Sequence, residues 1–276
     1  MRTVPVTDAA TSAYFVPLEQ LPDGTERFEP TGHTLSTWST DMQHGSPPSA
    51  LLARAVRRCE QRADTRVTRM VIEILGAVPL TEIRVRSWVE RPGRRIELVV
   101  AELSAEQPDG SWRAVARGTG WRLQTADTAA IAHPADAEMP VRTGTSALPE
   151  GTFWHSGFID TVDWNWLTPI GAPGTSHAWG RPTPELVQGE PLEPLDRLFL
   201  VADTANGVGT KIDPAEWTFL NTDVTVHIFR APEGDWVGVA AETSYGPDGI
   251  AMSSGVLHDD CGPVARVTQT VQVRAR

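Results

Sequence analysis

The stretch EPLDRLFLVADTAN at residues 193–206, followed by WTFLNTDVTVHIFR at residues 217–230, decides the fold of this chain. In the first segment, apolar residues recur every three or four positions, which predicts a helix that packs on one side only. In the second, polar and apolar residues alternate as in a strand with one buried face. Three more strand-like runs complete this part of the chain: 235–244, 250–258 and 263–273. The sequence therefore predicts one helix followed by an antiparallel sheet.

The first part of the chain repeats this scheme. Residues 49–62, SALLARAVRRCEQR, predict a helix after His44-Gly45-Ser46-Pro47-Pro48, with Arg54 on its polar face. Four strand-like runs follow this helix: 66–75, 81–90, 94–103 and 112–123. The segment Val115-Ala116-Arg117-Gly118-Thr119 also matches Val264-Ala265-Arg266-Val267-Thr268 at four of five positions. These agreements indicate a duplicated unit.

The repeat predicts an α+β fold with a first domain at 1–124 and a second at 151–276. The segment between them, 125–150, is rich in Ala, Thr and Pro and shows no period, which is typical of a surface linker. A sheet that buries one face needs a helix across it. We therefore expect a double hotdog, in which two antiparallel sheets each wrap around a central helix. Pairing of the two sheets would cover their exposed edges.

Charge and composition exclude several classes of function. The formal net charge of −11 disfavours a nucleic-acid partner, because binding phosphates along a duplex needs a basic face. It does not exclude one anionic small ligand, which a few arginines or helix amides can hold. No apolar run approaches the ~20 residues of a membrane span, and the first residues lack a leader pattern, so we expect a cytoplasmic protein without a membrane partner.

The sequence also lacks several reactive motifs. Its two cysteines, Cys59 and Cys261, form no cluster, so neither a disulfide framework nor a cysteine-based zinc site is expected. There is no GxSxG elbow, no complete phosphate-binding loop and no HExxH motif. We therefore predict no metal and no cofactor.

In its second half the chain resembles the TesB-like acyl-CoA thioesterases. The resemblance rests on Leu195 to Asp203 in the helix, on Asn221-Thr222-Asp223 with Arg230, and on Val264-Ala265 to Gln269 in the last strand. It implies hydrolysis of an acyl-CoA or acyl-carrier thioester by a water molecule that three side chains hold: Asp203, Asn221 and Gln269. Asn221 stands where the family carries a hydroxyl, although an amide can also donate and accept hydrogen bonds.

Alternation within the strands refines these candidates. Gln269 is the one polar residue among Ala265, Val267, Val271 and Val273, so we expect it to be buried and to need partners. Regular alternation places Asn221 and Asp223 on one face of their strand, opposite the core, where they could line a groove between the halves. Asn206 follows Asp203 by three residues and is a further candidate for substrate binding.

Two segments of the first half are candidates for substrate binding. His44 and Gly45 precede the first helix, where backbone amides could hold the thioester oxygen. Arg94 lies in the Arg91-Pro92-Gly93-Arg94 turn, which also resembles the family and could meet the phosphates of coenzyme A. Because sheets of this kind associate, we expect a homodimer or a larger homo-oligomer.

Two other functions remain open at this point. A non-catalytic acyl-thioester binding protein would explain Asn221 in the position of a hydroxyl. An enoyl-thioester hydratase or dehydratase needs an acid/base pair such as Asp and His. Asp223 and His227 share a strand face but lie roughly 13 Å apart at strand spacing, which disfavours this reaction.

Overall fold

The computed structural model describes residues 12–146, 148, 153–155 and 157–276, and these residues are mostly sheet with few helices. The strands are β1 (Ala13–Leu18), β2 (Glu26–Pro30), β3 (Thr65–Ile74), β4 (Ile83–Arg91), β5 (Ile96–Glu106), β6 (Trp112–Gln124), β7 (Val162–Trp166), β8 (Ser176–Pro182), β9 (Glu185–Val187), β10 (Trp217–Asn221), β11 (Asp223–Ile228), β12 (Val237–Tyr245), β13 (Ile250–Asp259) and β14 (Gly262–Ala275). The helices are α1 (Ser46–Arg58), α2 (Gly157–Asp160), α3 (Pro194–Ala202) and α4 (Ala205–Val208), with short 3₁₀ turns η1 (Gly32–Thr34) and η2 (Ala129–Ile131).

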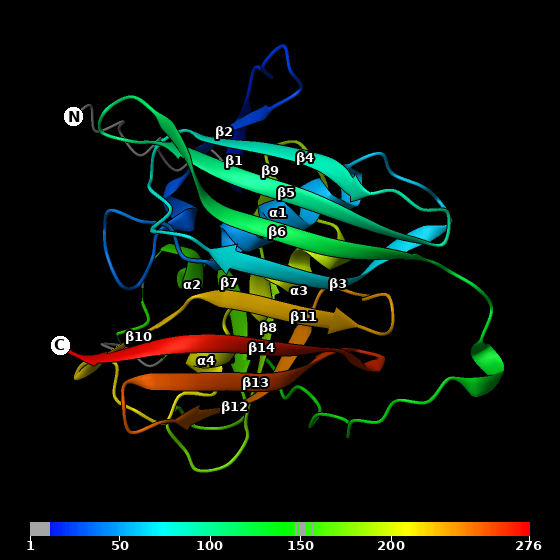
Figure 1. Ribbon diagram of the computed structural model, residues 1–276. Coiled ribbons are helices and arrows are strands. Elements are labelled where there is room, and N and C mark those ends of the chain that lie inside the picture. Colours follow the sequence, from blue (N-terminus) through cyan, green and yellow to red (C-terminus); the bar gives the residue numbers. More distant parts are fainter. Residues whose placement is uncertain (1–11, 147, 149–152, 156) are drawn as a thin grey trace.

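The strands of the two halves lie in one continuous sheet. Its order is β7-β8-β12-β13-β14-β11-β3-β6-β5-β4-β2-β1-β9, and β10 pairs with β14 beside this path. On one side of the sheet lies a first strand set, β1–β6 with β9, and on the other a second strand set, β7, β8 and β10–β14. The two sets join at the antiparallel pair β3–β11 (Figure 1), in which Val71 lies opposite Thr225. Edge pairing of this kind satisfies the backbone groups that two separate sheets would leave open.

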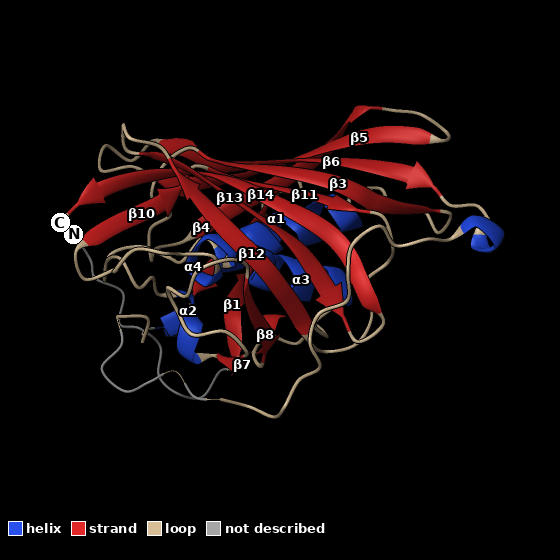
Figure 2. Cartoon of the chain, turned by 90° about the horizontal axis from the view of Figure 1, so that it is seen from below, coloured by secondary structure: helices blue, strands red, loops and turns tan. Residues whose placement is uncertain are grey.

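The two ends of the sheet also come together. Only Thr183 and Pro184 connect β8, near one end, to β9, which forms the other end by pairing in parallel with β1. The sheet therefore curls around the helices, and Figure 2 shows α1 and α3 between the long strands and the layer that holds β1, β7 and β8. None of the helices in the described ranges is long and apolar enough to cross a membrane.

Helix α1 begins three residues earlier than predicted, because Pro47 and Pro48 occupy its first turn, where proline needs no amide partner. Arg54, predicted on the exposed face, is only 2% exposed. Its guanidinium is paired with Glu190 at 2.7 Å and with Glu26 at 3.1 Å. The apolar spacing located the helix, but these ion pairs bury the side that the sequence left to solvent.

Helices α1 and α3 lie side by side and run in opposite directions. At one end, Arg57 near the end of α1 is 2.9 Å from the carboxylate of Asp196 in the first turn of α3. At the other end, Ser46 in the first turn of α1 reaches Asp203, which ends α3. The catalytic candidates of the second half therefore meet the helix start of the first half.

Asp196 provides a prediction for stability against pH. Burial raises the pKa of Asp196 to about 6, against the attraction of Arg57. Because the folded state holds this proton more tightly than the unfolded state, Asp196 stabilises the fold fully below the unfolded pKa of 3.8. That stabilisation is lost as the pH rises through the folded pKa of about 6. On acidification from pH 7 toward 4, the wild type should therefore gain up to about 3 kcal/mol of unfolding free energy relative to Asp196→Asn.

Urea titration of both proteins across this pH range measures that difference, and all other groups cancel in the comparison. A difference that stays constant would show that the ion pair with Arg57 offsets the burial of Asp196, and one that moves in the opposite direction would show that the ion pair outweighs it.

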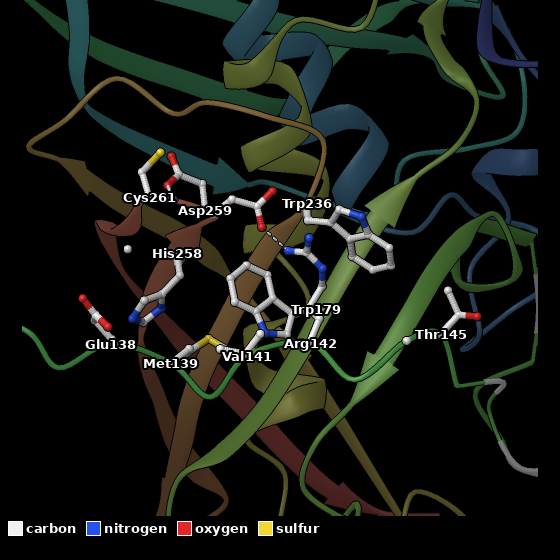
Figure 3. Close-up of a pocket in the computed structure, with 13 residues that line it drawn as sticks. Glu138, Met139, Val141, Arg142, Thr145, Trp179, Trp236, His258, Asp259 and Cys261 are labelled. Carbon is white, nitrogen blue, oxygen red and sulfur yellow. Dashed lines mark hydrogen bonds and ion pairs between the residues drawn. The ribbon is translucent and has the colours of Figure 1, made fainter.

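The segment between the halves crosses the outer face of the second strand set. Asp136 pairs with Arg266 on β14, the Ala137 carbonyl contacts His258 on β13, and Trp179 on β8 donates to the Pro140 carbonyl at 3.1 Å. Arg142 lies between the rings of Trp179 and Trp236 (Figure 3). The described residues of this segment thus form a strap fixed to the sheet at several points, although most of them are exposed.

Candidate active site

Asp203 is the centre of the candidate site. It follows the last turn of α3 and is 3% exposed. Its Oδ1 atom accepts hydrogen bonds from Asn221 Nδ2 at 2.8 Å and from Gln269 Nε2 at 3.4 Å. Its Oδ2 atom accepts one from Ser46 Oγ at 3.4 Å. The structure therefore brings together the three side chains that the resemblance named as catalytic.

Gln269 holds the turn that carries Asp203. It lies on the inner face of β14 and is 1% exposed, so the prediction of a buried amide is confirmed. Its Nε2 atom donates to the main-chain carbonyl of Asp203 at 3.0 Å, and its Oε1 atom accepts from the N–H of Asn206 at 2.9 Å. One amide thus satisfies both ends of the turn between α3 and α4 and fixes where the carboxylate lies.

A β-bulge directs Asn221 toward Asp203. Asn221 lies opposite Val271 in the β10–β14 ladder, whereas Thr225 lies opposite Thr268 in the β11–β14 ladder, so one extra residue is inserted between them. The extra residue is Thr222, whose N–H donates to the Thr270 carbonyl. The prediction that Asn221 and Asp223 share a face was wrong, because the bulge reverses the alternation and turns Asn221 to the interior.

Asp223 serves the bulge itself. Its Oδ1 atom accepts from the N–H of Thr270 at 2.8 Å, and its Oδ2 atom accepts from Thr225 Oγ1 at 3.3 Å. Its main-chain carbonyl accepts a second hydrogen bond from Asn221 Nδ2 at 3.2 Å. The structure thus places Asp223 beside the catalytic candidates as a support for Asn221, and not in the lining of the cavity that they face.

Arg94 lies apart from the cluster. It is exposed in the β4–β5 turn, two residues before Ile96, which pairs with Leu123. The site instead adjoins the opposite end of these strands, where Ile74 pairs with Ala116. The structure therefore does not bring Arg94 to Asp203.

The start of α1 closes the site from the other half. A Cβ atom on Gly45 would lie 2.6 Å from Asp203 Oδ2, so only glycine lets the backbone approach the carboxylate this closely. Ser46, which sequence reasoning did not select, contacts the same oxygen. The signal for Ser46 was its place directly after Gly45 at a helix start, but the sequence alone did not show which acid lies opposite.

His44 lies between the carboxylate and an aromatic ring. Its ring stacks on Phe158 at a centroid distance of 4.7 Å, and its Nδ1 atom is 3.5 Å from Asp203 Oδ2. The N–H of Ser46 donates to the same Nδ1 atom at 3.1 Å. Burial lowers the pKa of His44, against the attraction of the Asp203 carboxylate.

These residues face a cavity of about 200 Å³, which both halves line. The second half contributes Asp203, Asn206 and Asn221, and the first contributes His44, Gly45 and apolar residues at the end of β3. A second cavity of about 30 Å³ adjoins it at His44 and Asn206, and its lining includes four tryptophans: Trp38, Trp154, Trp164 and Trp166. The larger space suits a short or compact apolar group, since a cavity of ~150 Å³ holds one benzene ring.

A larger groove elsewhere lacks this arrangement. It measures about 550 Å³ and lies between the strap and the sheet, around Arg142, Trp236 and His258 (Figure 3). Its arginine is paired with Asp260, and its wall includes the β13–β14 turn at Gly262, far along β14 from Gln269. Within the described ranges, no group of three His, Cys, Asp or Glu side chains could hold a metal ion.

Comparison with known proteins gives two family matches that together span most of the chain. A family model of the acyl-CoA thioesterase C-terminal domain matches residues 113–273, and that of the acyl-CoA thioesterase N-terminal domain matches residues 34–123. No curated protein matches the chain.

Solved structures with the same fold include three bacterial proteins. A conserved protein of unknown function with a hotdog fold from Alicyclobacillus acidocaldarius has a TM-score of 0.71 at 13% identity, covering 91% of this chain and 94% of its own. The acyl-CoA thioesterase II TesB2 of Mycobacterium marinum has a TM-score of 0.63 at 17% identity, covering 94% and 95%. The tesB protein of Mycobacterium avium subspecies paratuberculosis has a TM-score of 0.65 at 14% identity, covering 93% and 96%. At these identities the likeness shows the hotdog fold.

Proposed function

The chain belongs to the acyl-CoA thioesterase family, and we propose that it hydrolyses an acyl-CoA or acyl-carrier thioester in the cavity at Asp203. The observation that supports this proposal is the buried Asp203 carboxylate, held by Asn221 and Gln269 at the wall of a cavity that both halves line. A carboxylate in this position can take a proton from a water molecule as that water attacks a carbonyl carbon.

The proposed reaction uses the chain's own side chains. Asp203 accepts the proton of the attacking water, and Asn221 and Gln269 keep the carboxylate in place. The tetrahedral intermediate then loses the thiol, which takes back the proton from Asp203. The products are a carboxylic acid and a free thiol, and the site contributes no covalent bond to either.

Thiol release tests this proposal. The purified protein would be mixed with acyl-CoAs of short, medium and long chain, and the free thiol would be measured with a thiol-reactive dye. We expect turnover with the shorter or more compact acyl groups, which the cavity volume favours. Binding without thiol release at any chain length would sink the hydrolase proposal in favour of a binding protein.

Hydration of an enoyl thioester is the second candidate, because one observation favours it. The sequence offered only Asp223 and His227 as an acid/base pair, but the structure places His44 Nδ1 3.5 Å from Asp203 Oδ2 beside the cavity. An Asp–His pair can move a proton to and from a carbon next to a thioester. Loss of enoyl absorbance without thiol release, measured with an added enoyl-CoA, would identify this reaction.

Asn221 gives a prediction for the proposed hydrolysis. Replacement by Leu removes the donor 2.8 Å from Asp203 Oδ1, so kcat should fall by about 10- to 100-fold. Replacement by Thr restores the hydroxyl that the family carries and should keep kcat within about tenfold of the wild type. Steady-state kinetics with one acyl-CoA checks both, and a Leu variant as active as the wild type would exclude Asn221 from the site.

The wider architecture forms part of the same proposal. We propose that residues 1–124 and 151–276 are two related hotdogs, each of which supplies one central helix and its own strands of the continuous sheet, and that 125–150 links them. On the outer face of the sheet in the first half, the apolar side chains of Ile96 and Leu123 are 46% and 36% exposed. This exposure supports association into a homodimer or a larger homo-oligomer. We also propose a cytoplasmic enzyme of fatty acid metabolism, and the free thiols of Cys59 and Cys261 fit the reducing compartment.

A further inference from the structure

The hydrogen bonds of His44 define which ring nitrogen carries its proton. The N–H of Ser46 donates to Nδ1 at 3.1 Å, so Nδ1 must present a lone pair. A neutral imidazole with an accepting Nδ1 atom carries its hydrogen on Nε2. Burial disfavours the charged ring and lowers the pKa of His44, so the neutral form prevails at neutral pH.

The Nε2–H group is free to donate. Stacking on Phe158 fixes the plane of the ring, and the side chain of His44 keeps 14% of its surface exposed. The residue lines both cavities, the one at Asp203 and the one walled by tryptophans. No described residue accepts a hydrogen bond from Nε2. A neutral donor therefore borders the space that the substrate would occupy.

The start of α1 offers few other donors for an oxyanion. Pro47 and Pro48 have no N–H group. The N–H of Ser46 is bound to His44, and that of Ser49 is bound to the Gly45 carbonyl at 3.0 Å. Only the N–H of Gly45 remains unused by the residues that the structure describes. One amide is fewer than the pair of donors typical of an oxyanion hole.

We propose that His44 supplies the second donor, so that its Nε2–H and the Gly45 N–H together bind the carbonyl oxygen of the thioester. This inference rests on the proposed hydrolysis. When water adds to the carbonyl carbon and Asp203 takes its proton, the negative charge forms on an oxygen that accepts from both groups. When the C–S bond breaks, the carbonyl forms again and the thiolate receives the proton from Asp203. His44 stays neutral throughout and acts as a donor, not as a base.

Two substitutions separate this role from a structural one. In His44→Gln, the side-chain amide nitrogen reaches the place of Nε2 and keeps a donor toward the cavity. In His44→Asn, the side-chain oxygen takes the place of Nδ1 and keeps the hydrogen bond from Ser46, but no donor reaches the cavity. We expect kcat to fall by about 100-fold or more in His44→Asn, the scale of one lost oxyanion donor, with little change in KM. His44→Gln should stay within about tenfold of the wild type.

The opposite order, or equal losses in the two variants, would overturn the proposal, because His44 would then act through Ser46 or through the ring alone. Nitrogen NMR of the wild-type imidazole gives a readout apart from activity and from the folding of any variant. We expect the Nε2–H tautomer near neutral pH, and an Nδ1–H tautomer or a charged ring would refute the donor role. If the wild type releases no thiol, the proposed hydrolysis itself fails, whereas a reversed order in an active enzyme removes only this inference.

Discussion

Asp203→Asn is expected to lower kcat for thioester hydrolysis by about 1,000-fold or more, within the range that a positioned acid or base contributes. Asp203 is the carboxylate that lines the cavity, and an amide in its place cannot take a proton from water. The substitution keeps the size of the side chain and a carbonyl oxygen to accept from Asn221, so the fold should persist. Kinetics of thiol release measures the loss.

A matched acid elsewhere provides the control. Asp213 is exposed, and its carboxylate accepts from the N–H of Ala215 at 2.8 Å, a bond that asparagine can also accept. Asp213→Asn should therefore leave kcat unchanged. If Asp203→Asn retains more than about a tenth of wild-type turnover, Asp203 is not the base, and the proton of the water must go elsewhere.

Gly45→Ala is expected to reduce both activity and stability. The added Cβ would lie 2.6 Å from Asp203 Oδ2, closer than these atoms can approach, and 3.1 Å from its Cγ, which is a tight contact. The carboxylate must then shift toward Asn221 and Gln269 on its other side, which distorts the hydrogen bonds that it accepts from them. We expect kcat to fall by about 100-fold, as when a catalytic group is displaced by roughly 1 Å. The unfolding free energy should fall by about 1–3 kcal/mol, as in overpacked cores.

A double-mutant cycle locates the cause of that loss. In an Asp203→Ala background the clash is absent, so the further substitution of Gly45 should cost little additional stability. Chemical denaturation of the four proteins gives the coupling energy. If Gly45→Ala destabilises both backgrounds equally, the strain comes from the backbone of Gly45 and not from the contact with Asp203.

The sequence predicted the regular parts of the fold well. The spacing of apolar residues located both central helices, and alternation located eight runs that hold nine strands, because these elements bury one face each. It missed β1, β2, β7, β8 and β9, whose short segments carry little periodicity of their own. These strands pair with one another and, through β2 and β8, with the long strands β4 and β12, and such tertiary pairing leaves no local pattern.

The site was predicted in part. Gln269 stood out because one amide among valines must have partners, whereas Ser46 looked like an ordinary helix start. Alternation failed at Asn221, because a single inserted residue at Thr222 reverses every face that follows. Asp203 and Gly45 lie far apart in the chain, and their contact depends on two antiparallel helices that no local pattern reveals.

The pair β3–β11 has a consequence for folding during synthesis, because its two strands leave the ribosome at different times. Val71 can pair only after Thr225 has been synthesised, roughly 150 residues later, which takes about 8–30 s at ordinary translation rates. During that time the first half is complete in sequence, yet the long edge of β3 is open to any other nascent strand. β1 waits longer still, until β9 has emerged. The finished sheet leaves no such edge at β3, but the growing chain exposes it to pairing with other chains. The risk of misassembly in this fold is therefore greatest during synthesis.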